Sequence, residues 1–521
     1  MTPARAEIDV GSSTDGVFPQ ALLDSLDRDP GGVAFEHGAR TVTRGELLDL
    51  VGRFASGLRA AGLGPGRGVA VGTAVTPEGF AVLLAAYALG CRVVGVRPGL
   101  TPAQLPHVVG DVDALVVDDA VGTPELVAAA GSATVLRIGP GLQGEPEKPV
   151  AVGDPDDVAV VTFTSGSTGT PKGVALTYAA MSAKWWHLRV RDPRAERLSE
   201  GYDRFLLFGT LTSVVMQEHL HVCLLSGGTA VIPEGLPVFP RVIPELRVTA
   251  CLLTVARLHH VLDVLRAERV DLSGLRVMIV SGSPIAPHRM AEAFERIGPA
   301  VRQGYGQTEI GLITMLTAED VATWPGAIGS VGRPWAGIEL EVRDDDGHPL
   351  PTGRIGEIWV RTAYALKGYW NDEEQTADLL RDGWVRTRDI GHLDERDFLH
   401  LTGRARDVII VNAIIHYAGP IEQALASHPR VDQAYVVGAP DERTGEAAHA
   451  FVVRAGDRDP NPDDLRALVA AALGEAAVPA TITVVPGVPV APSGKPDKRA
   501  LLSALPTGVF LGSSARRPSG R

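Results

Sequence analysis

Residues 164–173 read Thr164-Ser165-Gly166-Ser167-Thr168-Gly169-Thr170-Pro171-Lys172-Gly173 and follow an apolar, β-branched run at 157–163. Backbone N–H groups and hydroxyl oxygens in a loop of this composition can surround phosphate groups, and the lysine supplies positive charge. The spacing does not fit the Walker pattern, because no Gly-Lys-Ser/Thr sequence follows Gly166 or Gly169. A solvated Ser/Gly turn is the alternative. We interpret the stretch as a phosphate-binding loop of a different kind at the end of a buried strand.

The sequence around this loop alternates short β-branched runs with Ala/Leu-rich helical segments. Runs at 68–72 and 92–96 flank a helical segment at 79–89, and this rhythm is typical of βαβ units in a largely parallel sheet. Similar runs recur at 113–117, 157–163, 229–232, 250–253 and 275–280. After Ser330, short strands at 338–342 and 356–360 predict a small β subdomain. The fold class is therefore α/β, with parallel-rich sheets in a large N-terminal domain.

A chain of 521 residues is too long for one hydrophobic core, so at least two domains are expected. A polar stretch at 401–407 precedes a compact α+β segment with strands at 408–411, 433–437 and 448–453. We predict an N-terminal domain over 1–403, a small mobile C-terminal domain over 404–505, and a disordered tail over 506–521.

Composition excludes several classes of partner. The net charge is −13, from 62 acidic and 49 basic residues, and it opposes binding to nucleic acid or to an anionic membrane. No apolar run is long enough to span a bilayer, so a cytoplasmic protein is expected. The cysteines, Cys91, Cys223 and Cys251, are isolated in apolar stretches and are predicted to be core residues.

A second cluster reads Gln303-Gly304-Tyr305-Gly306-Gln307-Thr308-Glu309. It resembles a truncated dinucleotide fingerprint, but Glu309 stands where the last glycine would be, so the NAD interpretation is weak. Tyr305 could flank a purine, Thr308 could donate to a phosphate oxygen, and Glu309 could hold Mg²⁺. A surface loop is the alternative interpretation.

Two further clusters lie near the predicted domain boundary and the C-terminus. Stretches 384–391 and 401–407 contain Asp389, which suits a ribose diol, and Arg404; a surface salt bridge is the alternative for both. Stretch 492–499 holds Lys495 in a Gly/Pro turn, which by itself could be a solvated turn.

These four clusters, in this order, resemble the adenylate-forming (ANL) superfamily, which includes acyl-CoA synthetases, peptide-synthetase adenylation domains and firefly luciferase. The resemblance runs from about Val17 to Leu505. It implies that Tyr305 lies against adenine, that Thr308 contacts the α-phosphate, that Lys495 is a mobile catalytic lysine, and that Arg406 is the hinge of a rotating C-terminal domain. The implied ATP-binding and AMP-binding residues are Thr164, Ser165, Gly166, Ser167, Thr168, Gly169, Lys172, Gly282, Ser283, Gly304, Tyr305, Gly306, Asp389 and Arg404, with Glu309 as the Mg²⁺ ligand.

The resemblance also implies the reaction. A small-molecule acid attacks the α-phosphorus of ATP with Mg²⁺ as cofactor, giving an acyl-AMP and pyrophosphate. The acyl group then passes to a thiol, either CoA or the phosphopantetheine of an acyl carrier protein. The oligomeric state is left open, a homodimer included.

Departures from the family pattern bear on the acceptor and the acid. Ala413 stands where a glycine usually lies beside the pantetheine tunnel, and Arg388 replaces the glycine that usually precedes the ribose-binding aspartate. The segment 208–217 lacks the usual aromatic-His pair of the acyl pocket, and its mixed polar and apolar side chains favour a small or aryl acid. The predicted pocket residues are Phe208, Thr210, Thr212, Met216 and Gln217.

Two alternatives to a thiol ligase remain. One is an atypical biosynthetic member that activates nitrite to diazotise an aryl amine, or that transfers to nitrogen. The other is an inactive nucleotide-binding scaffold, which would require the loss of Lys495 or Glu309, and both residues are present.

Overall fold

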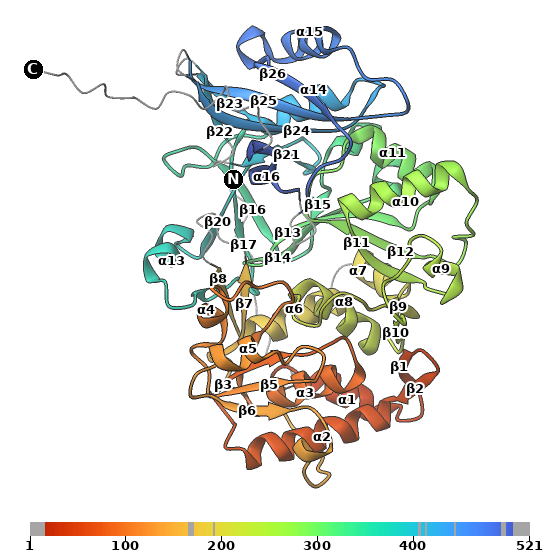
Figure 1. The fold of residues 1–521 in the computed structure, drawn as a ribbon, viewed down its shortest axis with the longest axis vertical. Coiled ribbons are helices and arrows are strands. Elements are labelled where there is room, and N and C mark those ends of the chain that lie inside the picture. Colours follow the sequence, from red (N-terminus) through yellow and green to blue (C-terminus); the bar gives the residue numbers. More distant parts are fainter. Residues whose placement is uncertain are drawn as a thin grey trace, which may run out of the picture.

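The computed structural model describes residues 16–164, 171–190, 193–404, 408–411, 414–441, 444–490 and 496–503. Three sheets build the larger, N-terminal part of the chain, and a fourth sheet builds the smaller C-terminal part. The C-terminal sheet lies at one end of the molecule, and the N-terminal strands and helices of the chain lie at the other (Figure 1).

The first sheet has nine strands in the order β15-β14-β13-β12-β11-β9-β10-β1-β2. Its central strands β1, β10, β9, β11, β12 and β13 run parallel, whereas β2, β14 and β15 pair antiparallel at the two edges. The strands are β1 (Val33–His37), β2 (Arg40–Thr43), β9 (Arg204–Leu206), β10 (Thr229–Ile232), β11 (Ala250–Thr254), β12 (Val277–Ser281), β13 (Val301–Gln307), β14 (Gly311–Thr317) and β15 (Arg333–Pro334).

The second sheet has seven strands in the order β18-β8-β7-β4-β3-β5-β6. The strands from β7 to β6 are parallel, and β8 and β18 add antiparallel pairs at one edge. The strands are β3 (Gly68–Gly72), β4 (Arg92–Gly95), β5 (Ala114–Val117), β6 (Thr134–Arg137), β7 (Val158–Thr164), β8 (Lys172–Thr177) and β18 (Gly368–Tyr369).

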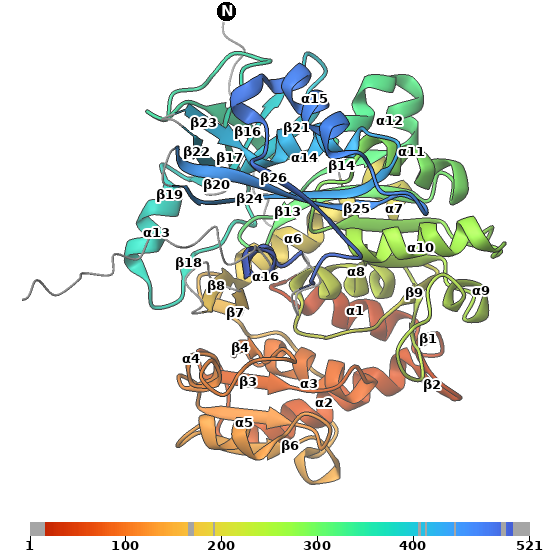
Figure 2. The same ribbon diagram turned by 45° about the horizontal axis from the view of Figure 1, so that its top comes forward.

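Helices pack around these two sheets. Figure 2 shows α1, α2 and α3 close to one another, and α10 packs against β11 and β12 of the larger sheet. The helix α3 is apolar all round and almost completely buried, as expected for a helix between two layers. The helices are α1 (Gln20–Arg28), α2 (Arg44–Ala60), α3 (Pro77–Ala88), α4 (Leu105–Val109), α5 (Pro124–Ala129), α6 (Tyr178–Val190), α7 (Pro193–Ser199), α8 (Val214–Leu225), α9 (Val242–Glu245), α10 (Val255–Ala267), α11 (Pro287–Arg296), α12 (Ala318–Thr323) and α13 (Glu373–Leu379).

The helix starts follow from local sequence. Thr43 forms a capping box with Glu46 at the start of α2, and Thr76 caps α3, which begins with Pro77. Such caps satisfy N–H groups that a helix leaves unpaired at its first turn.

The third sheet is the predicted small β subdomain. It is formed by β16 (Glu339–Arg343), β17 (Gly356–Arg361), β19 (Leu380–Arg381), β20 (Trp384–Leu393) and β21 (Leu399–Arg404), all paired antiparallel. The fourth sheet, with α14 (Ala418–Ala426), α15 (Pro462–Leu473) and α16 (Lys498–Ser503), contains β22 (Val408–Val411), β23 (Ile414–Tyr417), β24 (Val431–Asp441), β25 (Gly445–Arg454) and β26 (Thr481–Val485).

The predicted fold class is confirmed: a large sheet-rich α/β domain and a smaller C-terminal α+β domain. The division at 403 and 404 stays a prediction, and the predicted tail at 506–521 lies outside the described residues. All three cysteines are buried, as predicted. Within the described part of the chain, no helix combines the length and apolar character needed to cross a bilayer.

Candidate active site

The carboxyl ends of the parallel strands in the larger sheet bring predicted site residues to one edge. Gly282 and Ser283 follow β12, and Thr308 and Glu309 follow β13. Phe208 follows β9 in the same sheet. Ligands bind most often at such an edge, because the loops there converge from several strands.

Three glycines at this edge lie where a side chain would be strained or crowded. Gly282 has a φ of +99°, in the region that side chains with a Cβ rarely adopt. A Cβ at Gly306 would lie 2.1 Å from the carbonyl oxygen of Gly311, and one at Gly304 would lie 2.7 Å from the Leu312 side chain. The backbone of β13 and β14 can therefore approach this closely only because these side chains are absent.

Asp389 is the centre of a buried hydrogen-bond cluster. Its Oδ2 accepts from the Tyr305 hydroxyl and from Gln307 Nε2, both at 2.7 Å, and Arg404 Nε lies 2.9 Å from Oδ1. Arg404 stands directly opposite Asp389 in the β20–β21 ladder. Burial, with the negative charge of Asp389, raises the pKa of Tyr305 well above its usual value, so this phenol stays protonated and donates. The cluster unites three residues predicted to bind nucleotide and adds Gln307.

Arg388, next to Asp389, has a left-handed backbone with φ of +58°. A glycine adopts this conformation without strain, which agrees with the glycine expected here from the resemblance. The Arg388 guanidinium pairs with Asp378, and Asp378 also pairs with Arg386 at 3.2 Å. The positive charge that Arg388 adds at this position is therefore paired with the Asp378 carboxylate.

Glu309 is linked through Tyr369 to Lys172, which follows the predicted phosphate-binding loop. Its Oε1 accepts from the Tyr369 hydroxyl at 2.9 Å, and the backbone carbonyl of Glu309 accepts from Leu366 N at 2.8 Å. Lys172 Nζ lies 5.4 Å from the centre of the Tyr369 ring. Tyr369 belongs to β18, which pairs with β8, so this strand connects the loop of one sheet to Glu309 of the other.

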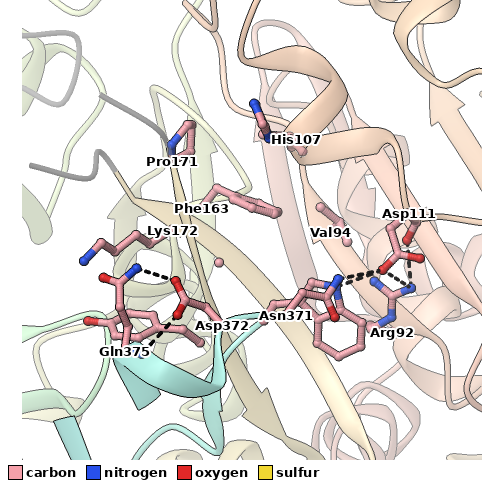
Figure 3. Close-up of a pocket in the computed structure, with 14 residues that line it drawn as sticks. Arg92, Val94, His107, Asp111, Phe163, Pro171, Lys172, Asn371, Asp372 and Gln375 are labelled. Carbon is pink, nitrogen blue, oxygen red and sulfur yellow. Dashed lines mark hydrogen bonds and ion pairs between the residues drawn. The ribbon is translucent and has the colours of Figure 1, made fainter. Parts of the chain in front are cut away.

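A cavity of about 290 Å³ lies beside Lys172 and Tyr369, along the seven-stranded sheet. Figure 3 shows Lys172, Asp372 and Gln375 at one end, Arg92, Asp111 and Asn371 at the other, and Phe163 between them. The Arg92 guanidinium lies 4.2 Å from the centre of the Trp370 ring and pairs with Asp111 at 3.7 Å. The cavity therefore has an apolar floor and polar ends.

The predicted phosphate-binding loop connects two paired strands, β7 and β8. Thr164 ends β7 and stands opposite Lys172, the first residue of β8, and its hydroxyl donates to the Lys172 carbonyl at 3.4 Å. Lys172 also lines the cavity of Figure 3. The loop residues between these strand ends, predicted as Ser165, Gly166, Ser167, Thr168 and Gly169, lie outside the described part of the chain.

Lys495 and Arg406, predicted as the catalytic lysine and the hinge, also lie outside the described residues, as does Ala413. The residues flanking the Lys495 segment are anchored, because Val490 pairs with Pro496 and Asp497 N donates to the Pro489 carbonyl at 2.8 Å. Pro496 lines a small cavity together with Gly282 and Ser283. The chain on the C-terminal side of Lys495 therefore lies at the predicted adenine site.

The two domains meet close to this cavity. Arg289 of α11 forms an ion pair with Asp432 of β24, and both side chains are buried. Arg289 also pairs with Glu292 at 2.8 Å, and Tyr435, farther along β24, lines the cavity beside Gly282. The first half of β24 thus contacts the larger domain beside the cavity that Pro496 lines.

The five residues predicted to line the acid pocket lie close together, and most of them are buried or hydrogen-bonded within the protein. The hydroxyls of Thr210 and Thr212 are 2.9 Å apart. Gln217 Nε2 donates to the Leu211 carbonyl at 2.6 Å, and the Gln217 amide oxygen accepts from the Tyr87 hydroxyl at 3.4 Å. Met216 and Phe208 are buried. These residues line neither of the two cavities above, and their role in substrate binding stays a prediction.

Two residues that bond predicted site residues, Gln307 and Tyr369, were missed from sequence. Gln307 lies inside the quoted Gln303–Glu309 stretch, and the alternation of side chains along β13 would have placed it on the same face as Tyr305. Tyr369 carries no local signal, because its partner Glu309 is 60 residues away in the chain.

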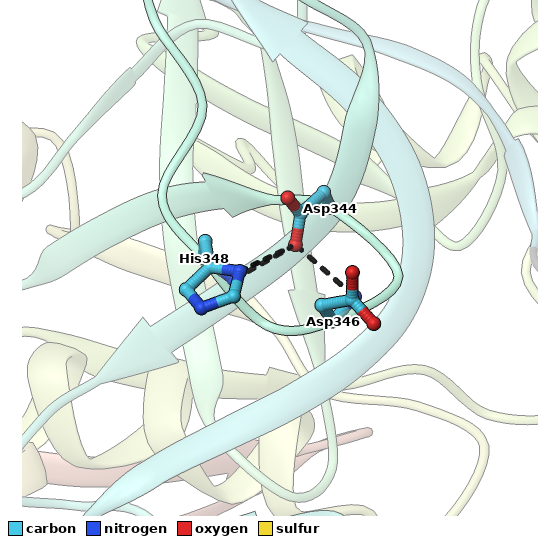
Figure 4. A group of neighbouring side chains, drawn as sticks. All are labelled: Asp344, Asp346 and His348. Carbon is cyan, nitrogen blue, oxygen red and sulfur yellow. Dashed lines mark hydrogen bonds and ion pairs between the residues drawn. The ribbon is translucent and has the colours of Figure 1, made fainter.

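A separate group of possible metal ligands is formed by Asp344, Asp346 and His348 (Figure 4). It lies in the turn after β16, and the Asp344 carboxylate accepts from the backbone N–H groups of Asp346 at 3.1 Å and His348 at 2.8 Å. These bonds account for the arrangement as a stabilised turn.

A model of the AMP-binding enzyme family matches residues 22–370 of this chain, and a model of the AMP-binding enzyme C-terminal domain matches residues 420–495. The chain belongs to the adenylate-forming superfamily of AMP-binding enzymes. It is an AMP-forming ligase of an ATP-dependent adenylating family.

Three relatives illustrate the different kinds of ligase and synthetase in this superfamily. A fatty acid–[acyl-carrier-protein] ligase from Streptomyces coeruleorubidus is 31% identical over 92% of this chain and 93% of its own. The amide bond synthetase McbA from Marinactinospora thermotolerans is 36% identical with a TM-score of 0.83, covering 93% of this chain and 99% of its own. The o-succinylbenzoate CoA synthetase MenE from Bacillus subtilis, in complex with an acyl-adenylate, is 25% identical with a TM-score of 0.78, covering 92% and 97%.

Proposed function

We propose that this AMP-forming ligase activates a small or aryl carboxylic acid as its acyl-adenylate and transfers the acyl group to the nitrogen of an amine. The observation that carries the choice of acceptor is the higher identity to the amide bond synthetase, 36%, than to the CoA synthetase, 25%, over nearly the same share of this chain. The substitution of Ala413 for the usual tunnel glycine agrees with this choice, because a methyl group narrows the passage for a pantetheine arm.

In the first step, a carboxylate oxygen of the acid attacks the α-phosphorus of ATP, and the bond to pyrophosphate breaks. Asp389 accepts the ribose hydroxyls, with Tyr305 and Gln307 fixing its orientation through their hydrogen bonds. Lys172 and the loop that precedes it bind the β- and γ-phosphates. Lys495 approaches from the C-terminal domain and stabilises charge on the transferring phosphoryl group.

Glu309 is the residue that fits Mg²⁺. Its side chain is half-buried, its Oε1 accepts one hydrogen bond from Tyr369, and its Oε2 has no partner among the described residues, so one oxygen is left for a cation. Mg²⁺ there would offset the negative charge of the triphosphate.

In the second step, the amine nitrogen attacks the acyl carbon of the adenylate, AMP leaves, and the nitrogen loses a proton. A thiol acceptor is the second candidate, since the carrier-protein ligase is 31% identical over 92% of this chain. CoA and a carrier-protein pantetheine present the same nucleophile.

The test is mass spectrometry of products from enzyme, Mg-ATP and a panel of aryl and small acids, with benzylamine or CoA added in separate reactions, and of products from enzyme, Mg-ATP, nitrite and aniline. We expect pyrophosphate release with at least one acid and an amide when the amine is present. A thioester formed in preference to the amide would replace the first candidate by the second, and a diazo product from nitrite and an aryl amine would overturn both.

The control is Lys495→Ala. We expect this variant to lower ATP–pyrophosphate exchange by about 10²-fold or more, because it removes the charge that offsets repulsion between two anionic reactants. An unchanged exchange rate would contradict the assignment of Lys495.

A further inference from the structure

Arg257 lies at the same edge of the larger sheet as the predicted nucleotide residues. It is in the first turn of α10, directly after β11, and its neighbours Thr254, Val255 and Ala256 line the cavity that Gly282 and Ser283 share with Pro496. Phe208, predicted to line the acid pocket, follows the adjacent strand β9. Arg257 therefore stands between the nucleotide side and the acid side of this edge.

Two aromatic rings hold the Arg257 side chain. Its guanidinium carbon lies 4.9 Å from the centre of the Phe208 ring and 5.4 Å from that of Phe239. The two rings are 5.6 Å apart in a T-shaped arrangement. A guanidinium stacked on an aromatic face keeps its N–H groups free at its rim, where they can form a planar fork of hydrogen bonds.

No carboxylate of the described residues lies within ion-pair distance of Arg257, and no carbonyl among them accepts from it. Two other half-buried arginines differ: Arg204 forms a bidentate pair with Glu36, at 2.9 and 2.6 Å, and Arg194, which lies over the Trp335 ring, donates to the Pro334 carbonyl at 2.7 Å. Partial burial lowers the pKa of Arg257, and no opposing charge raises it again. The remaining stabilisation from two rings is modest for a half-buried cation, so a ligand acceptor would complete the site.

We propose that Arg257 binds the end of the acid substrate remote from the reacting carboxylate, and that this end carries acceptor oxygens, most favourably a second carboxylate. This inference rests on the proposed adenylation of an aryl or small acid and specifies its substrate class. Phe208 and Phe239 fix the guanidinium, and Arg257 distinguishes acids with a polar far end from acids that are apolar throughout.

The experiment measures ATP–pyrophosphate exchange with three para-substituted benzoates of similar size: terephthalate, 4-acetylbenzoate and 4-isopropylbenzoate. Wild-type enzyme, Arg257→Leu and the matched Arg257→Lys are compared by the ratio of kcat/KM between acids. This ratio is insensitive to the folded fraction of a variant. We expect the wild type to favour terephthalate over 4-isopropylbenzoate by about ten- to a hundredfold, the leucine variant to lose this preference, and the lysine variant to keep part of it.

Equal ratios in the wild type and in Arg257→Leu would overturn the proposal, as would a wild-type preference for the isopropyl acid. Exchange with none of a broad panel of acids would instead count against the proposed function. Exchange with the apolar acid alone would leave adenylation standing and remove the role of Arg257.

Discussion

The two ends of the nucleotide site are built differently. At the predicted ribose end, Asp389 is buried and already accepts hydrogen bonds from Tyr305 and Gln307, with Arg404 at 2.9 Å. At the predicted phosphate end, Glu309 and Lys172 are partly exposed, and Lys172 borders a cavity of about 290 Å³. The predicted ribose end is therefore preorganised by hydrogen bonds within the protein, whereas the half-buried Glu309 at the predicted phosphate end accepts one hydrogen bond, from Tyr369.

This contrast predicts the largest loss at the phosphate end. Glu309→Gln removes a negative charge with little change of shape, and we expect ATP–pyrophosphate exchange to fall by about 10²-fold or more, because charge on the transferring phosphoryl group is no longer offset by a bound cation. The measurement is the exchange rate at saturating Mg-ATP.

Tyr369→Phe is the matched control, since it keeps the aromatic ring and the Glu309 carboxylate and removes the hydrogen bond between them. We expect a loss of less than about tenfold. If Glu309→Gln exchanged as well as this control, Glu309 would not be the cation ligand.

At the ribose end we expect the effect to appear mainly in ATP binding. Asp389→Asn exchanges an acceptor-only carboxylate for an amide, and we expect the KM for ATP to rise by about ten- to a hundredfold with a smaller change in kcat. Gln307→Leu keeps the carboxylate and removes one of its donors, so its effect on KM should be smaller. A fall in kcat at unchanged KM for Asp389→Asn would show that this end acts in the transition state instead.

The ion pair that joins the two domains beside the predicted adenine site is expected to give an effect of intermediate size. Arg289→Met leaves the buried Asp432 carboxylate without its ion-pair partner, and we expect this to destabilise the docked domains by about 3 kcal/mol. We expect the ATP–pyrophosphate exchange rate to fall as well, because the C-terminal domain carries Lys495, the proposed catalytic lysine.

The double variant Arg289→Met with Asp432→Leu should recover part of the exchange rate, since it removes the unpaired charge as well. A double variant that is worse than the single one would indicate that the contact acts by shape and not by charge.

The smallest effect is expected at Arg388. Arg388→Gly keeps the left-handed backbone but removes its strain, which costs a residue with a Cβ about 1 kcal/mol of stability. It also removes the ion pair with Asp378, which contributes up to about 1 kcal/mol. We expect the KM for ATP to change by less than about threefold, because the guanidinium is paired with Asp378. A tenfold change would place the Arg388 cation at the nucleotide.

Much of this site could be predicted from the sequence because its parts are local. The stretches 164–173 and 303–309 each combine a strand with the loop that follows it, and hydrophobic runs and glycines mark such units without any long-range information. Gln307 illustrates the limit, because its amide donates to a carboxylate 82 residues away.

Short strands at or near a sheet edge were harder to predict than the longer central strands. The strands near 68–72, 250–253 and 408–411 were expected, but β1 and β2 at the edge of the larger sheet were not, and neither was the short strand β18. An edge strand contributes few apolar residues, and a two-residue strand has no period to detect.

The sequence by itself determined the superfamily, the α/β class and the order of the chemical groups along the chain, because each depends on short stretches whose residue types are constrained locally. Only the tertiary structure decided which groups meet: Tyr305 and Gln307 on Asp389, Tyr369 on Glu309, and Arg289 on Asp432. The physical reason is that these contacts join residues from different sheets or domains, and their geometry depends on how the strands pair and how the domains pack.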